Sequence, residues 1–284
     1  MLRPDSFARV SAAAVVPEQI ISYVRAVSGS RPRLVGSCIA YQTGTELVLV
    51  GYPLPDPTDE TAMAAAVDEA LTIKELSRLT VIGPARPPQA PAGTRFGRDC
   101  YALLPLPPPA PGQKLRNMLR RAARELTVQP GRLWGEEHQA LVDQYLASRS
   151  LDSGTIHIFR QIPDYLAASG GSLLFSARTS AGRLAALVVG EFASLETAFF
   201  MFCFRDPQAA PPGSTDLLLA ALVDEAVKRG HARLNLGLGI NEGVRFFKRK
   251  WGASAELPCF QGAWDIEPPG LARRLRAFFG KEKQ

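Results

Sequence analysis

The stretch that decides the fold reads His231-Ala-Arg-Leu-Asn-Leu-Gly-Leu-Gly-Ile-Asn-Glu-Gly-Val-Arg-Phe-Phe-Lys-Arg-Lys-Trp-Gly-Ala253. Its apolar run Leu234-Asn-Leu236 follows a helix-ending Gly230, and this pattern predicts a buried strand. Gly237 and Gly239 come next, so the backbone there can bend sharply or approach a ligand closely. The stretch therefore predicts a strand whose carboxyl end opens into a glycine-rich turn.

The segment after this turn, Gly243–Gly252, combines aromatic rings with four cations. Cationic side chains beside the N–H groups of a turn favour an anion such as phosphate or carboxylate. A purely structural interpretation stays open, in which the rings are core residues and the cations form a solvated face. The rings are Phe246, Phe247 and Trp251, and the cations are Arg245, Lys248, Arg249 and Lys250.

The composition sets wide limits. The 284 residues allow one large domain or two ordinary ones, and a hydrophobic content of 46% is enough for a substantial core. The formal net charge of +6 makes the chain mildly basic. Such a charge is compatible with nucleic acid, acidic lipid or phosphorylated substrates and selects none of them.

Cysteine usage and hydropathy suggest a cellular location. The four cysteines lie far apart and form no CxxC pair, so we predict buried free thiols and no metal site. The apolar segment 11–16 stops at Pro17 and is too short for a signal peptide. No apolar run has the length of a membrane helix, so we expect a cytoplasmic protein without a transmembrane segment.

The first hundred residues alternate strand and helix patterns. Apolar runs at 34–41 and 46–52 predict a hairpin, and residues 59–74 predict a helix capped by Thr58 or Asp59. Further strands are expected at 79–82 and 99–104. The proline-rich segment that follows is the best domain boundary. We therefore expect a first lobe at 1–104, a linker at 105–112 and a second lobe at 113–284.

The second half begins with helix patterns at 113–126, 135–148 and 155–169, and His138 is expected on the exposed side of its helix. Strand patterns follow at 173–179, 183–192 and 196–205, with near-continuous apolar runs that indicate a sheet covered on both faces. A long helix from about Ser214 to Arg229 precedes the strand at Leu234. The tail, 270–284, predicts a short basic amphipathic helix.

The helix predicted at 113–126 is strongly basic. Cations early in a helix oppose its macrodipole, so some positive use for them is worth considering. They form either a solvated face or a cationic wall toward an anionic ligand. The cations are Lys114, Arg116, Arg120, Arg121 and Arg124, and the apolar stripe between them is Leu115, Met118, Leu119 and Ala122.

The order of these elements resembles the GNAT acyltransferase fold. The run Leu234-Asn-Leu-Gly-Leu-Gly239, followed by Phe247-Lys-Arg-Lys-Trp-Gly-Ala253, is similar to the strand, glycines and FKxxxG ending of one GNAT branch. That branch contains FemAB-like peptidoglycan aminoacyltransferases, BioF2-like acetyltransferase domains and phosphatidylglycerol lysyltransferases, and its second half also opens with an arginine-rich helix. The resemblance implies an α/β (α+β) fold of two GNAT-like lobes, each a mixed, mostly antiparallel sheet flanked by helices, with the first lobe reduced.

The resemblance also implies an acyltransferase that uses an activated acyl donor and an amine or hydroxyl acceptor. The donor is acyl-CoA or aminoacyl-tRNA, and tRNA or an anionic lipid is a further expected partner. Ordinary CoA-dependent members carry an Arg/Gln-x-x-Gly-x-Gly/Ala loop before the long helix. Here that position reads Pro211-Pro-Gly-Ser-Thr-Asp216, which weakens the case for acetyl-CoA and fits the aminoacyl members.

By resemblance, Lys248 at the FK position contacts a phosphate or the developing oxyanion. The residues expected to bind the donor or shape its channel are Arg116, Arg120, Gly213, Ser214, Thr215, Asn235, Gly237, Gly239, Phe247 and Lys250. No general base stands out, because Asp152 and Glu191 have only their polarity to recommend them.

Two alternatives stay open. One is a CoA-dependent N-acetyltransferase, and the other is a degenerate GNAT pair that binds a ligand without chemistry. Nucleic-acid binding alone is disfavoured, because the cationic clusters lack the interleaved exposed aromatics of a single-strand binding platform.

Overall fold

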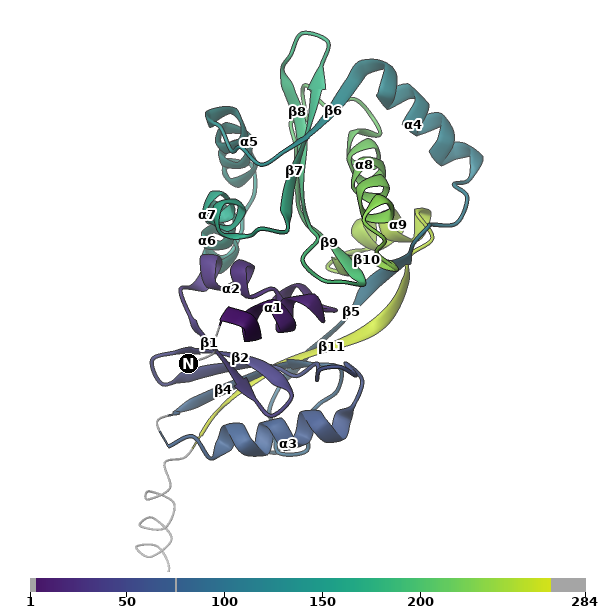
Figure 1. The fold of residues 1–284 in the computed structure, drawn as a ribbon. Helices are drawn as coiled ribbons and strands as arrows, with labels where there is room; N and C mark the ends of the chain where they lie inside the picture. The colour runs from purple at the N-terminus through teal and green to yellow at the C-terminus, as the bar shows by residue number, and fades with distance from the viewer. Residues whose placement is uncertain (1–3, 75, 267–284) are drawn as a thin grey trace, which may run out of the picture. The chain divides into compact units, whose positions relative to one another are not determined.

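The computed structural model describes residues 4–74 and 76–266, and the chain in it forms two compact units (Figure 1). Of the described residues, unit 1 contains 30–98 and 258–266, and unit 2 contains 4–29 and 99–257. The tail helix predicted at 270–284 lies outside the described residues. Each unit has its own core and is described separately below.

The boundaries between the units differ from the predicted ones. The expected linker, 105–112, lies inside unit 2, and so do residues 4–29, which we expected in the first lobe. Strands β5 (Phe96–Pro105) and β11 (Ser254–Asp265) carry the chain from one unit to the other. Strand pairing explains the difference, because β5 pairs with β10 of unit 2 and the end of β11 pairs with β4 of unit 1.

Unit 1 has the strand order β1-β2-β3-β4-β11. Its strands β1 (Arg31–Val35), β2 (Cys38–Thr43) and β3 (Glu46–Val50) form an antiparallel meander. Helix α3 (Glu60–Leu71) then crosses over to β4 (Arg78–Gly83), which pairs parallel to β3. The carboxylate of Asp59 accepts a hydrogen bond from the Ala62 N–H at 2.9 Å, so the predicted cap is confirmed.

Unit 2 has the strand order β5-β10-β9-β8-β7-β6. Strands β6 (Leu126–Gly131), β7 (Ser172–Thr179), β8 (Leu184–Glu191) and β9 (Thr197–Arg205) are antiparallel neighbours. Strand β10 (Arg233–Leu238) is parallel to β9 and antiparallel to β5. This mixed, mostly antiparallel sheet flanked by helices confirms the predicted fold class.

Helices cover both faces of the unit 2 sheet, as the apolar runs predict (Figure 1). One face packs against α8 (Ser214–Lys228) and α4 (Gln113–Glu125). The other packs against α5 (Glu136–Ala147), α6 (Ser153–Arg160) and α7 (Ile162–Ala168). All eight residues of β8 are buried, because adjacent side chains point to opposite faces and both faces are occupied.

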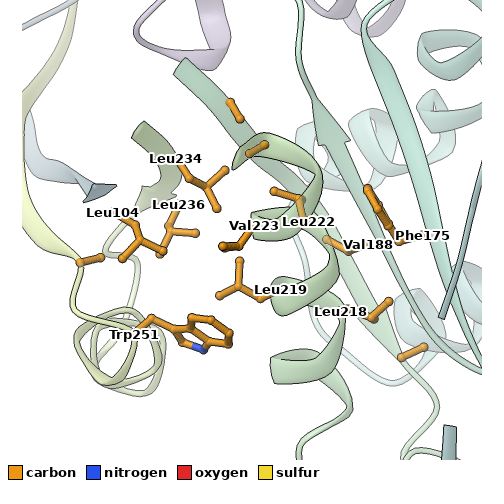
Figure 2. Packing of buried hydrophobic residues seen from close by; sticks show 14 of the residues in the cluster. Leu104, Phe175, Val188, Leu218, Leu219, Leu222, Val223, Leu234, Leu236 and Trp251 are labelled. Carbon is orange, nitrogen blue, oxygen red and sulfur yellow. The ribbon is translucent and has the colours of Figure 1, made fainter. Parts of the chain in front are cut away.

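Helix α8 is the centre of the larger core. Figure 2 shows Leu222 of this helix directed toward Val188 of β8. On a neighbouring side, Leu219 is directed toward Trp251, which follows α9 (Glu242–Lys250). The indole N–H of Trp251 donates to Asp216 in the first turn of α8 at 2.9 Å, so α9 is anchored to α8 by both packing and a buried hydrogen bond.

The sequence interpretation missed several elements of unit 2. Helix α1 (Pro4–Ala12), β6 and β11 were not expected. For the helix predicted at 155–169, Pro163 indicates either a kink or a new start, and the segment is divided at Gln161 into α6 and α7, with Pro163 in the first turn of α7. The spacing of Ile20, Ile21, Val24 and Val27 predicts a short amphipathic helix from Pro17 to Val27, and the structure has η1 (Pro17–Gln19) followed by α2 (Ile21–Ser28) there. The surface position predicted for His138 is wrong: it is buried and contacts the Ser176 hydroxyl at 2.9 Å.

Close packing of α8 on β8 gives a stability prediction. A Cβ atom on Gly190 would lie 2.8 Å from Leu222 Cδ1, so Gly190→Ala should lower the free energy of unfolding by about 1–3 kcal/mol. Gly170→Ala is the matched control, because open space surrounds that position and the change should be near neutral. Urea denaturation of both variants checks this, and equal stabilities would contradict the packing.

Candidate functional site

The centre of the candidate site is the place where β9 and β10 separate. Their parallel pairing covers only three residue pairs, from Arg233–Thr197 to Asn235–Phe199. Beyond this point β9 continues to Arg205, while the register of β10 against β5 shifts between Asn235 and Leu238. The extra residue on β10 is a bulge, which bends a strand locally. The strand and the glycine-rich turn predicted from the sequence are therefore present, and the turn begins with Gly237 at φ 78°.

The Asn235 side chain holds the first part of the turn. This residue is fully buried, and its carboxamide oxygen accepts a hydrogen bond from the Gly237 N–H at 2.8 Å. Its NH₂ group donates to the Val15 carbonyl at 2.8 Å. Asn235 thus replaces the strand hydrogen bonds that the shift in register removes, and it ties the turn to the segment before η1.

Lys248 holds the second part of the turn. Its Nζ donates to the carbonyl oxygens of Gly237 at 2.7 Å and Leu238 at 2.6 Å, and the residue is only 5% exposed. Burial lowers the pKa of Lys248 to about 8, and attraction to the nearby Asp99 carboxylate opposes this shift in part. Two of the three ammonium hydrogens are used by the backbone, so one remains to contact a substrate oxygen.

The amino end of α8 differs from an open phosphate site. A Cβ on Gly213 would lie 2.7 Å from Met118 Cγ, because α4 packs against this end of α8. Ser214 is buried, with its hydroxyl bonded to the Pro211 carbonyl, and the Thr215 hydroxyl contacts the Cys203 thiol. The structure therefore does not bring Gly213, Ser214 and Thr215 to open space where a donor phosphate could bind.

The cations predicted to bind the donor, Arg116, Arg120 and Lys250, lie in different surroundings. A pocket of about 340 Å³ within unit 2 is lined by the proline segment 108–112, by apolar residues of α4 and α8, and by Arg249 and Lys250. Arg116 is not one of the lining residues, but it donates to the carbonyl of Pro111, which is, at 2.6 Å. Arg120 instead lies on the exposed side of α4, bonded to Asn117. Lys250 is paired with Asp216 at 2.6 Å.

The aromatic residues of the motif also divide. Trp251 is part of the core, and Phe247 packs against the same core while its ring lies 5.0 Å from Lys250 Nζ. Phe246 is exposed. The motif is thus part core and part surface, and neither of the two interpretations offered by the sequence holds for all of it.

The two carboxylates considered as bases have structural roles. Asp152 caps α6 by accepting from the Thr155 N–H at 2.9 Å. Glu191 is buried and accepts from the hydroxyls of Tyr165 and Ser169, both at 2.6 Å, and from two backbone N–H groups. These bonds fix both carboxylates within the fold.

Glu18 is an acid that the sequence interpretation did not consider. It lies in η1 and accepts from the Tyr101 hydroxyl at 2.9 Å, where Tyr101 is the β5 partner of Leu238. Burial raises the pKa of Glu18. A raised pKa brings a carboxyl closer to the range of a general base. Only the fold reveals this, because η1 and β5 are far apart in sequence.

The cysteines do not contribute a reactive nucleophile to the candidate site. Cys38 and Cys259 are buried free thiols as predicted, whereas Cys100 and Cys203 are half-buried. Burial raises the pKa of both Cys38 and Cys203 to about 12, so neither is a ready nucleophile. In the part of the chain that the structure describes, no cluster of side chains could ligate a metal, and no helix is long and apolar enough to cross a membrane.

Comparison with known proteins gives a family match in the second half of the chain. The family model described as "Acetyltransferase (GNAT) domain" matches residues 113–249. This range begins at the first residue of α4 and ends within α9, so it contains β9, β10 and Lys248. No curated protein matches the sequence.

Solved structures share the fold over nearly the whole chain. FemX has a TM-score of 0.66 at 11% identity, over 92% of this chain and 96% of that chain. The C-terminal domain of a protein described as a lysylphosphatidylglycerol synthetase, from Agrobacterium fabrum, has a TM-score of 0.60 at 17% identity, over 96% and 94%. A tandem GNAT protein from the clavulanic acid biosynthesis pathway has a TM-score of 0.54 at 12% identity, over 93% and 95%. At these identities the likeness concerns the fold, and it agrees with the fold predicted from the sequence.

Burial of Lys248 predicts how stability depends on pH. The pKa of its amine is about 8 in the folded chain against an ordinary value of 10.5, so between these values the unfolded state binds more protons. The contribution of this residue to the free energy of unfolding should therefore increase as pH rises from 8 to 10.5. Lys248→Met isolates this contribution, because methionine does not titrate. The variant should also be destabilised by about 1–3 kcal/mol at every pH, because the carbonyls of Gly237 and Leu238 lose their donor.

The measurement is the difference in unfolding free energy between wild type and Lys248→Met at a series of pH values. That difference should grow in favour of wild type over this pH window. A difference that is constant from pH 7 to 10.5 would contradict the buried position of the amine.

Proposed function

The family model described as "Acetyltransferase (GNAT) domain" matches residues 113–249, and from this match we propose that the protein transfers an acyl or aminoacyl group from an activated donor to an amine or hydroxyl acceptor. The observation that carries the proposal is the separation of β9 from β10 beyond the Asn235–Phe199 pair. At this point backbone groups of β9 are free of their β10 partner, and they can bind an extended donor.

The proposed chemistry is direct transfer. The acceptor nitrogen or oxygen attacks the acyl carbonyl carbon, the bond to the donor's leaving group breaks, and the acceptor loses a proton. The protein contributes by positioning both substrates and by stabilising the negative charge that develops on the carbonyl oxygen. We assign oxyanion stabilisation to the third hydrogen of the Lys248 ammonium. We assign proton acceptance to the carboxylate form of Glu18.

We infer that the donor is aminoacyl-tRNA rather than acyl-CoA. The contact between Met118 and Gly213 leaves little room for a phosphate at the amino end of α8. The exposed face of α4 supports a polyanionic donor, because Lys114, Arg116, Arg120, Arg121 and Arg124 all lie on it. Among the described ion pairs only Arg121 of this group has an acidic partner, Glu125 at 3.7 Å. Such a face binds phosphates strongly at low salt.

A CoA-dependent acetyltransferase is the second candidate. The description of the matching family model favours it.

The proposed acceptor is an amine or hydroxyl, and the similarity to a lysylphosphatidylglycerol synthetase domain supports testing anionic lipids. The predicted cytoplasmic location stays a prediction.

The transfer activity can be tested with radiolabelled aminoacyl-tRNA and a mixture of lipid and amine acceptors. Lys248→Met should slow the loss of label from tRNA at least about 100-fold, because the turn that positions the donor loses its support. Lys228→Met, at the exposed end of α8, is the control and should react like wild type. A full rate in the Lys248 variant, with its fold intact by circular dichroism, would refute the assigned site.

The donor can be tested by calorimetry. We expect acetyl-CoA to show no submicromolar binding, and uncharged tRNA to bind with an affinity that falls steeply as salt is raised. Arg120→Gln combined with Arg124→Gln should weaken tRNA binding and reduce its dependence on salt. Submicromolar binding of acetyl-CoA would instead support the CoA-dependent alternative.

A further inference from the structure

Asp99 makes a set of contacts that neither the motif nor the family match points to. It lies in β5, far in sequence from the turn after β10. Its Oδ1 accepts hydrogen bonds from the Gly239 N–H at 3.0 Å and from the Cys100 N–H at 2.7 Å. Its Oδ2 accepts from the Ile240 N–H at 3.2 Å. One carboxylate therefore binds two successive N–H groups of the turn.

The backbone at Ile240 requires this support. Its φ is 31°, a left-handed conformation that β-branched residues adopt only under strain, and the side chain is 77% exposed. Exposure means that packing of the side chain does not hold the backbone in place. Successive N–H groups in such a turn form a concave site for an anion, and Asp99 supplies that anion.

The contact between Asp99 and the turn also explains why residue 239 is a glycine. A Cβ atom there would lie 2.8 Å from Asp99 Oδ1 and 2.9 Å from Arg245 Nε. A side chain at this position would push the carboxylate away from the turn. Gly239 was predicted to shape the donor channel, and the structure gives a specific reason for the glycine.

Charge links Asp99 to Lys248. The carboxylate is the group whose attraction opposes the effect of burial on the Lys248 amine. On α9, Arg245 also lies beside Gly239, and it is paired with Glu242 at 3.8 Å. Asp99 and Lys248 thus hold opposite sides of one turn, the carboxylate through its N–H groups and the amine through its carbonyls.

We propose that Asp99 is a positioning residue for acyl transfer: it fixes residues 237–240 in the conformation that presents Lys248 to the donor. This inference rests on the proposed function for its consequence, but its structural part can be tested without any substrate. Loss of the carboxylate leaves an empty two-amide anion site beside a buried ammonium, and a small carboxylate from solution can fill it.

The experiment measures the pKa of Lys248 by NMR titration of its side-chain CH₂–N signals in the full chain without ligand. Asp99→Asn keeps an acceptor oxygen and removes the charge, so the pKa should fall by about one pH unit. In Asp99→Ala the pKa of Lys248 should fall by a similar amount. Added sodium formate should raise it most of the way back to the wild-type value, whereas sodium chloride at equal ionic strength should not. Asp68→Asn, an exposed change on α3, should leave the titration unchanged.

Two outcomes would overturn the proposal. One is a Lys248 titration in Asp99→Asn that coincides with wild type. The other is a shift in Asp99→Ala that formate and chloride change equally. If the titrations behave as expected but no donor is consumed by the wild-type protein, the proposed function fails while the positioning by Asp99 stands. With an active enzyme, formate should also restore at least part of the rate lost in Asp99→Ala.

Discussion

The structure depends on one constraint: backbone groups at a buried strand end must find partners when the neighbouring strand leaves. Beyond Asn235, β10 has no partner in β9, and its register against β5 shifts. Three side chains supply the missing bonds, with Asn235 and Asp99 accepting from N–H groups and Lys248 donating to carbonyls. These bonds are partly buried, and an unpaired backbone group out of contact with water costs more than a single such bond contributes, so the three contacts matter to the fold as well as to the site.

The anchoring of α9 makes this arrangement rigid. Lys248 reaches the turn from a helix whose end is fixed by Trp251 in the core and by the Trp251–Asp216 hydrogen bond. Asp216 belongs to α8, which packs closely on the sheet at Gly190. The strand, the turn and the lysine therefore keep their relative positions through the same core that stabilises unit 2, and an acyl donor would meet a site formed in advance.

Much of this could be predicted from the sequence, and the limits have physical causes. The elements from β7 to β10 follow from apolar periodicity, and the turn follows from Gly237 and Gly239. The importance of Lys248 came from the motif, but its bonds to two carbonyls did not, because nothing in a sequence shows which way an ammonium points. Asp99 and Glu18 were missed, since strand pairing alone brings them near β10. The close contact of Gly213 with Met118 could not be predicted, because the sequence at a helix start gives no sign of a covering side chain.

The central claim is that the acyl group is held where β9 and β10 separate. Photocrosslinking with a donor that carries a photoreactive acyl group, followed by mass spectrometry of the labelled peptides, tests it most directly. Aminoacyl-tRNA and acyl-CoA versions of the probe should be compared. The account predicts labels within residues 200–205 of β9 or 236–241 after β10, and competition by the unlabelled donor. Efficient, competable labelling confined to other parts of the chain would contradict it.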